Sequence, residues 1–116
     1  MTEKYRVVYS PEAYRDLADV YSYIAYTLKE KRTASNHLNR IRQEISSLRT
    51  FPERYSAVDW EPWASMGMRK VSVGNYVVYY QVDRVGRIVT VIRIFYGGRD
   101  VEHIIGEETS GNYPTA

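Results

Sequence analysis

Two neighbouring segments place apolar residues three or four positions apart, and this spacing constrains the fold more than any other feature. The first segment carries Ala13, Leu17, Val20, Tyr21, Ile24 and Leu28, and the second carries Ala34, Leu38, Ile41, Ile45 and Leu48. Such spacing puts the apolar side chains on one face of an α-helix. Only the polar run 29–33 separates the segments. The pattern therefore predicts an antiparallel helical hairpin whose apolar face must be covered.

Local signals mark both ends of this hairpin. The tripeptide Ser10-Pro11-Glu12 supplies a capping hydroxyl, a proline suited to the first helical position and a carboxylate that complements the helix dipole. Phe51-Pro52 ends the second helix, because proline disfavours helical backbone angles in the residue before it. Residues 5–9, ahead of the hairpin, are rich in β-branched and aromatic side chains and predict a short strand.

The second half of the chain favours β-structure. Three runs rich in β-branched and aromatic residues, 68–73, 76–82 and 87–96, are separated by the turn sequences Gly74-Asn75 and 83–86. Combined with the first strand and the hairpin, these runs predict an α+β fold with the order β-α-α-β-β-β. We expect the helical hairpin to pack on one face of a mainly antiparallel sheet.

Three segments are less regular. Residues 53–67 lack periodicity and hold Trp60 and Trp63, so we expect an ordered loop whose aromatic rings cover the core or, alternatively, form a binding platform. Residues 99–105 fit a short helical turn or an edge strand, and the rest of the chain is polar. The sequence thus predicts a single domain over residues 1–105 and a polar C-terminal tail over 106–116.

Composition excludes several classes of protein. The 16 Lys and Arg residues against 14 Asp and Glu leave a net charge of +2, which by itself does not argue for nucleic acid. The absence of cysteine excludes a disulfide framework and a cysteine zinc site, and His37 and His103 lie too far apart for a metal cluster. No apolar run is long enough for a membrane span or a signal peptide. We expect a cytoplasmic protein with no metal, no cofactor and no membrane contact.

Four motifs in order along the chain carry a family resemblance. They are residues 8–13 with Asp16-Leu17 behind them, the run Leu48-Arg49-Thr50-Phe51-Pro52, the predicted hairpin 68–80, and the strand end 91–100. Together they resemble the RelE/ParE superfamily of toxins from type II toxin–antitoxin systems. The resemblance implies a cognate antitoxin of the ParD or RelB type, and contact with operator DNA only through that antitoxin.

The resemblance covers two branches with different targets. RelE-like members are ribosome-dependent messenger-RNA endonucleases, whereas ParE-like members block DNA gyrase. Met68, Val77 and Ile105 stand where RelE-like enzymes keep functional groups, so the resemblance favours a ParE-like inhibitor of growth with no catalytic residues.

Two alternatives remain open, and so does the question of whether the protein is an enzyme. One is a RelE-like endoribonuclease in which Lys70, Arg99 and His103 act on RNA, with Glu102 beside His103 as an acid–base partner. The other is an inactive relic that serves only as antitoxin partner or co-repressor. The sequence alone does not choose between gyrase and the ribosome as the target.

The candidate residues for binding target or antitoxin are polar side chains on the predicted strands and their ends: Arg69, Lys70, Arg93, Tyr96 and Arg99. Strand alternation puts Arg93 on the same face as Val91 and Phe95, where we expect an internal ion pair with Asp100 or Glu102, the alternative being contact with an acidic partner. Arg99 follows Gly97-Gly98, and we expect it to take part in binding.

Overall fold

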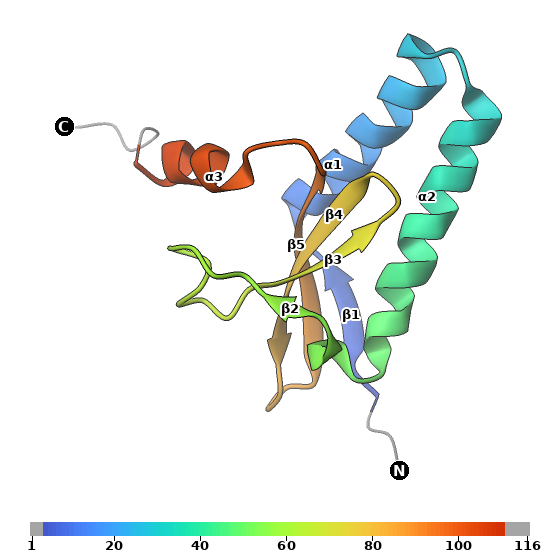
Figure 1. Ribbon diagram of the computed structural model, residues 1–116. Helices are drawn as coiled ribbons and strands as arrows, with labels where there is room; N and C mark the ends of the chain where they lie inside the picture. Colours follow the sequence, from blue (N-terminus) through green and yellow to red (C-terminus); the bar gives the residue numbers. More distant parts are fainter. Residues whose placement is uncertain (1–3, 111–116) are drawn as a thin grey trace.

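A computed structural model describes residues 4–110 of the chain (Figure 1). Within them the sheet has the strand order β1-β5-β4-β3-β2. Its strands are β1 (Arg6–Tyr9), β2 (Ser56–Ala57), β3 (Arg69–Val73), β4 (Tyr76–Asp83) and β5 (Ile88–Tyr96). The helices are α1 (Pro11–Ser22), α2 (Lys31–Ser46) and α3 (Val101–Ser110), with a π-helical turn at Tyr23–Thr27 after α1. No helix in this part of the chain is long and apolar enough to cross a membrane.

The sheet is mixed. β1 pairs in parallel with β5, and the other neighbouring strands are antiparallel. The hairpin of α1 and α2 covers one face of the sheet (Figure 1). The predicted α+β class, element order and packing of the hairpin are therefore confirmed. The short strand β2 lies inside the segment expected to be a loop, because two residues are too few to leave a periodic pattern.

The main core lies between the hairpin and the sheet. The stripe residues Ile41, Ile45 and Leu48 are at most 1% exposed and belong to one apolar cluster with the sheet residues Val78, Tyr80, Val89 and Val91 and with Leu17, Val20 and Ile24 of the first helical segment. Ser10 caps α1 as predicted, since its Oγ accepts a hydrogen bond from the Ala13 N–H at 3.0 Å. The hairpin is thus held by the residues that the periodic pattern selects.

The last residue of the first apolar stripe differs from the prediction. Leu28 was expected in the core but is 52% exposed, whereas Ile24 is 5% exposed. The cause is the π-helical turn, in which the Leu28 N–H donates to the Tyr23 carbonyl at 3.1 Å. This wider turn rotates the following residues away from the apolar face that a regular α-helix would continue.

A bulge changes the alternation in β5. Tyr79 pairs with Arg93 and Tyr80 with Val91, so Ile92 has no partner of its own in β4. The extra residue sends Val91 to the hairpin face, while Phe95 joins the cluster on the opposite face. The expectation that Val91 shares a face with Arg93 and Phe95 is therefore wrong, whereas Arg93 and Phe95 do lie side by side, with the guanidinium 4.4 Å from the centroid of the ring.

The second face of the sheet carries a smaller apolar cluster. Trp63, Met68, Tyr79 and Phe95 pack there with Val58, Val101 and Ile105. Trp63 is 4% exposed and Trp60 stacks on it with ring centroids 5.0 Å apart, so Trp63 covers the core as expected. α3 continues to Ser110, past the predicted end of the domain at 105, because Val101 and Ile105 anchor its first turns to this cluster.

Candidate interaction surface

Two grooves open on the described surface, and Arg99 lines both. The first, the sheet groove, has a volume of about 620 Å³ and lies on the sheet face opposite the hairpin. The second, the hairpin groove, has a volume of about 760 Å³ and lies between the helical hairpin and the adjoining ends of β4 and β5. Because Arg99 stands in the segment between β5 and α3, a partner that contacts it can enter either groove.

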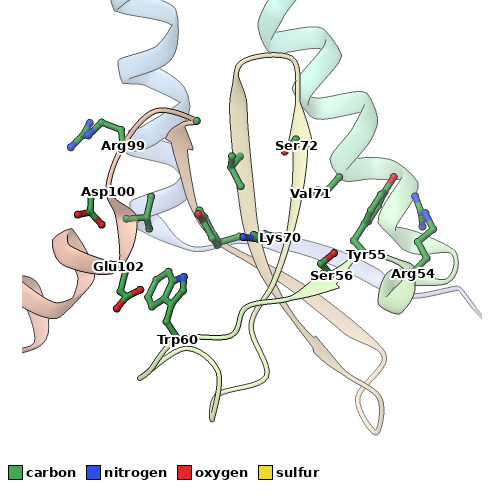
Figure 2. A pocket seen from close by; sticks show the side chains of 14 residues that line it. Arg54, Tyr55, Ser56, Trp60, Lys70, Val71, Ser72, Arg99, Asp100 and Glu102 are labelled. Atoms are coloured by element: carbon green, nitrogen blue, oxygen red, sulfur yellow. The ribbon is translucent and has the colours of Figure 1, made fainter.

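The sheet groove has two polar sides and a mixed floor. Residues 54–56 form one side and residues 99–102 the other, with Lys70 and Trp60 between them (Figure 2). Lys70 and Tyr79 are partners in the β3–β4 register, so their side chains are neighbours on the floor. Burial raises the pKa of the Tyr79 phenol above its ordinary value of 10.0, at which the group is already protonated at neutral pH.

The groove's cations differ in what they already bind. Arg54 donates hydrogen bonds to the carbonyls of Thr50 at 2.6 Å and Phe51 at 3.1 Å. Neither Lys70 nor Arg99 forms an ion pair with any residue between 4 and 110. The Arg99 guanidinium lies 5.8 Å from the centroid of the Phe95 ring. Lys70 and Arg99 can therefore bind a carboxylate or phosphate without breaking an internal salt bridge.

The hairpin groove is more apolar and carries large exposed side chains. Tyr23, Leu28 and Tyr96 are 54%, 52% and 54% exposed and all line it. Tyr96 contacts Tyr76 edge to face, with ring centroids 5.9 Å apart. Adjoining exposed apolar side chains of this size are typical of protein interaction sites.

Arg93 is bound internally, although not by the expected partners. Its Nε lies 3.0 Å from Asp16 Oδ2 and its Nη1 lies 3.1 Å from Glu108 Oε2. The guanidinium also lies 4.4 Å from the centroid of the Phe95 ring. Burial disfavours the charged form, but the hydrogen bonds and charges of Asp16 and Glu108 outweigh it and raise the pKa of Arg93. Arg93 thus joins α1, β5 and α3, and the expected pairing with Asp100 or Glu102 is wrong.

Arg69 has a similar internal role. Its Nη1 donates to the carbonyls of Glu53 at 3.1 Å and Tyr55 at 2.7 Å, and its Nη2 lies 3.5 Å from Glu53 Oε2. These contacts hold the segment before β2 against β3. A partner would have to compete with them in order to use this arginine.

The three residues of the ribonuclease alternative are not brought together. Lys70 and Arg99 line the sheet groove, but His103 does not, and its Nε2 lies 3.0 Å from Glu107 Oε1. Glu102 faces the groove without His103 beside it. Met68 and Ile105 are 0% and 4% exposed inside the second apolar cluster. Residues 4–110 also contain no group of three His, Asp or Glu residues placed to hold a metal ion.

Sequence reasoning missed three residues of this surface. Asp16 stands three positions after Ala13 and four before Val20, so an acid beside the apolar stripe was a readable signal for a partly buried partner. Tyr23 and Leu28 had no such signal, because the π-helical turn exposes them by a departure from regular spacing.

Solved structures of toxin–antitoxin complexes have the same fold. The chain from the chromosomal ParDE system of P. aeruginosa matches with a TM-score of 0.66 and 16% identity, over 81% of this chain and 97% of that one. A chain of the RelBE2 complex from Mycobacterium tuberculosis matches with a TM-score of 0.58 and 19% identity, over 80% and 91%. A chain of the archaeal RelE–RelB complex from Pyrococcus horikoshii OT3 matches with a TM-score of 0.56 and 18% identity, over 83% and 98%.

The sequence itself matches a family model. A comparison with curated proteins gives no match. Residues 7–101, from β1 to the first residue of α3, match the model described as "ParE toxin of type II toxin-antitoxin system, parDE". The match includes both helices of the hairpin, the whole sheet except the first residue of β1, and Arg99. The chain therefore belongs to the ParE toxin family of type II toxin–antitoxin systems.

Proposed function

We propose that this ParE-family toxin inhibits growth by binding DNA gyrase through the surface around Arg99, and that a cognate antitoxin neutralises it. The observation that carries the proposal is the position of Arg99. It lines both grooves and forms no ion pair with the described residues, so its guanidinium is available to a partner. Arginine pairs with a carboxylate through two parallel hydrogen bonds, which suits a specific protein contact.

The composition of the sheet groove supports binding rather than RNA cleavage. Attack by a 2′-hydroxyl needs a base, an acid and positive groups that stabilise the phosphate. Lys70 and Arg99 supply positive charge, but Met68 and Ile105 are buried among apolar side chains and His103 lies outside the groove. Lys70 and Arg99 can hold an anion, and the groups in the groove that could move protons include the carboxylates of Asp100 and Glu102 and the Tyr79 phenol, with no histidine among the described residues that line it.

The hairpin groove supports an antitoxin as the second partner. The similar structures come from complexes of a toxin with its antitoxin. In this chain Tyr23, Leu28 and Tyr96 expose apolar surface along that groove. An amphipathic segment of a ParD- or RelB-like antitoxin would bury these side chains, and an acidic residue in it would reach Arg99.

Two assays of the purified full-length chain test the target. We expect it to inhibit supercoiling of relaxed plasmid by gyrase, and we expect Arg99→Ala to reduce that inhibition. Primer extension on messenger RNA with ribosomes should show no new ends. Codon-site cleavage that disappears in Lys70→Ala would instead establish the RelE-like activity. A chain that inhibits neither reaction and is harmless when induced alone would be a relic that binds only its antitoxin.

A further inference from the structure

The positive charge of the protein is concentrated in α2 and in the short 3₁₀ turn Ser47–Arg49 that follows it. The chain contains 16 Lys and Arg residues and 14 Asp and Glu residues. Residues 31–49 hold five of the basic residues and one of the acidic residues, which leaves 11 basic and 13 acidic residues in the rest of the chain. The segment therefore carries a charge of +4 and the remainder −2. Its cations are Lys31, Arg32, Arg40, Arg42 and Arg49, and its one acid is Glu44.

These five cations are exposed and are not neutralised by an acid, although the Lys31 ammonium lies 5.7 Å from the centroid of the Tyr26 ring. All five side chains are exposed, and none forms an ion pair with another residue in the range 4–110. Glu44 forms no ion pair with any of them, and its Oε1 accepts the hydroxyl of Tyr55 at 2.5 Å. None of the five lines the sheet groove or the hairpin groove, although Arg40 stands on the same flank of α2 as Thr33, which lines the hairpin groove.

The cations lie on both flanks of the helix. Residues two positions apart on an α-helix point in nearly opposite directions. Arg40 leans towards the β3–β4 turn. Its Nη1 lies so close to Gly74 that a Cβ at this position would be 3.7 Å from it. Arg42 lies on the other flank, near enough to Tyr9 to lower the pKa of its phenol, although burial outweighs this effect. Positive charge thus borders the exposed side of α2 on both edges.

Between the flanks, α2 exposes only polar side chains. The exposed positions there are Arg32, Ser35, Asn36, Asn39, Gln43 and Ser46. A protein partner would need an apolar or aromatic anchor at the centre of the contact, and this face has none. Hydroxyl, amide and guanidinium groups are instead the side chains that bind phosphate oxygens and base edges.

We propose that the outer face of α2 binds duplex DNA. The major groove is about 12 Å wide and accepts one α-helix, with a phosphate backbone on each side. A helix in this position would direct Arg40 and Arg42 to phosphates of opposite strands, with Asn36, Asn39 and Gln43 between them. The toxin would then contact DNA itself, in addition to any contact that its antitoxin makes.

Fluorescence anisotropy with a labelled random-sequence duplex of about two helical turns tests this proposal on the purified full-length chain. We expect binding that weakens steeply between about 50 and 200 mM salt. A plot of the logarithm of the association constant against the logarithm of the salt concentration should fall with a slope of about 0.9 for each phosphate that the protein neutralises. The double variant Arg40→Gln/Arg42→Gln should lower the affinity at least about tenfold and flatten the slope.

The control variant makes the same change in net charge elsewhere. Arg6→Gln/Arg15→Gln alters exposed arginines of β1 and α1 that form no ion pair with another described residue, and it should bind DNA as the parent does. The proposal fails if the parent does not bind, or if both double variants weaken binding equally. It also fails if polyglutamate of equal charge binds as tightly as the duplex. Because gyrase is absent from this assay, its outcome is independent of the proposed target.

Discussion

Asp16 of α1 binds Arg93 and the backbone of β5 at the same time. Its Oδ2 lies 3.0 Å from Arg93 Nε and accepts the backbone N–H of Ile94 at 2.8 Å. β1 ends opposite Val91, so β5 has no strand neighbour on that side beyond this point. Ser10 Oγ donates to the Ile92 carbonyl at 2.7 Å. Side chains at the start of α1 thus take the place of the missing strand, because they form hydrogen bonds with the Ile92 carbonyl and the Ile94 N–H at an otherwise open sheet edge.

Asp16→Ala should destabilise the protein. It removes the acceptor of a backbone N–H and leaves Arg93, whose side chain is 17% exposed, without its shorter ion pair. We expect a loss of about 2–4 kcal/mol in the free energy of unfolding, measured by urea denaturation. Asp19→Ala, which changes an exposed acid of the same helix, is the control. Equal stability of the two variants would contradict the role of Asp16.

Ile41→Ala should weaken the core between hairpin and sheet. Ile41 is 1% exposed and belongs to the main apolar cluster. Truncating a buried isoleucine typically costs about 2–5 kcal/mol, because transfer energy is lost and a cavity remains. Val85→Ala removes methyl groups from a residue that is 96% exposed and should leave the melting temperature almost unchanged. An unchanged denaturation curve for Ile41→Ala would mean that the hairpin packing is wrong.

Stability should fall at alkaline pH because of Tyr80. Its hydroxyl donates to the Pro52 carbonyl at 2.6 Å, and burial raises its pKa from 10.0 to about 12. The folded state holds this proton more tightly than the unfolded state does. The stabilisation is therefore complete below pH 10 and is lost as pH rises towards 12, at up to about 1.4 kcal/mol per pH unit.

Urea denaturation at a series of pH values up to 11 measures this loss. The free energy of unfolding of Tyr80→Phe should depend less steeply on pH than that of the parent. At neutral pH the variant should be less stable, because the Pro52 carbonyl loses its hydrogen-bond donor. Tyr26→Phe, at a side chain that is 62% exposed, should keep the parent's dependence. Identical pH profiles for the parent and Tyr80→Phe would rule out Tyr80 as the source.

Arg99→Ala should separate toxicity from folding. The side chain is exposed and forms no ion pair with another described residue, so its loss should change the free energy of unfolding by no more than about 0.5 kcal/mol. Growth inhibition in cells without the antitoxin should nevertheless be relieved. Arg99→Lys should restore it only partly, because lysine lacks the planar fork. A folded Arg99→Ala variant as toxic as the parent would exclude this arginine from the toxic surface.

Leu28→Glu should weaken antitoxin binding while the fold is kept. Leu28 is 52% exposed in the hairpin groove, and a carboxylate there would have to be desolvated under a bound apolar segment. We expect affinity for the antitoxin, measured by calorimetry, to fall at least about tenfold, which corresponds to about 1.4 kcal/mol. Met66→Glu is the matched control, since Met66 is 50% exposed and lines neither groove. Equal affinities would place the antitoxin elsewhere.

Much of the fold was determined by the sequence alone, because the signals are local. The apolar steps from Ala13 to Leu48 predict the hairpin, Ser10 predicts its cap, and Gly74 predicts the β3–β4 turn, where its φ of +60° is one that a two-residue hairpin of type II′ requires. Each of these features depends on residues within a few positions of one another. The family resemblance also rests on such runs, and the family model confirms it.

The interaction surface was decided by tertiary structure. The bulge at Ile92 separates Arg93 from Val91, and the π-helical turn exposes Leu28; neither has a periodic signal. The partners of Arg93 come from α1 and α3, distant in sequence, so strand alternation could not identify them. Arg99 lies between two grooves only because β5 and α3 meet beside the hairpin. Contacts between distant segments set which side chains remain free, and spacing along the chain does not contain that information.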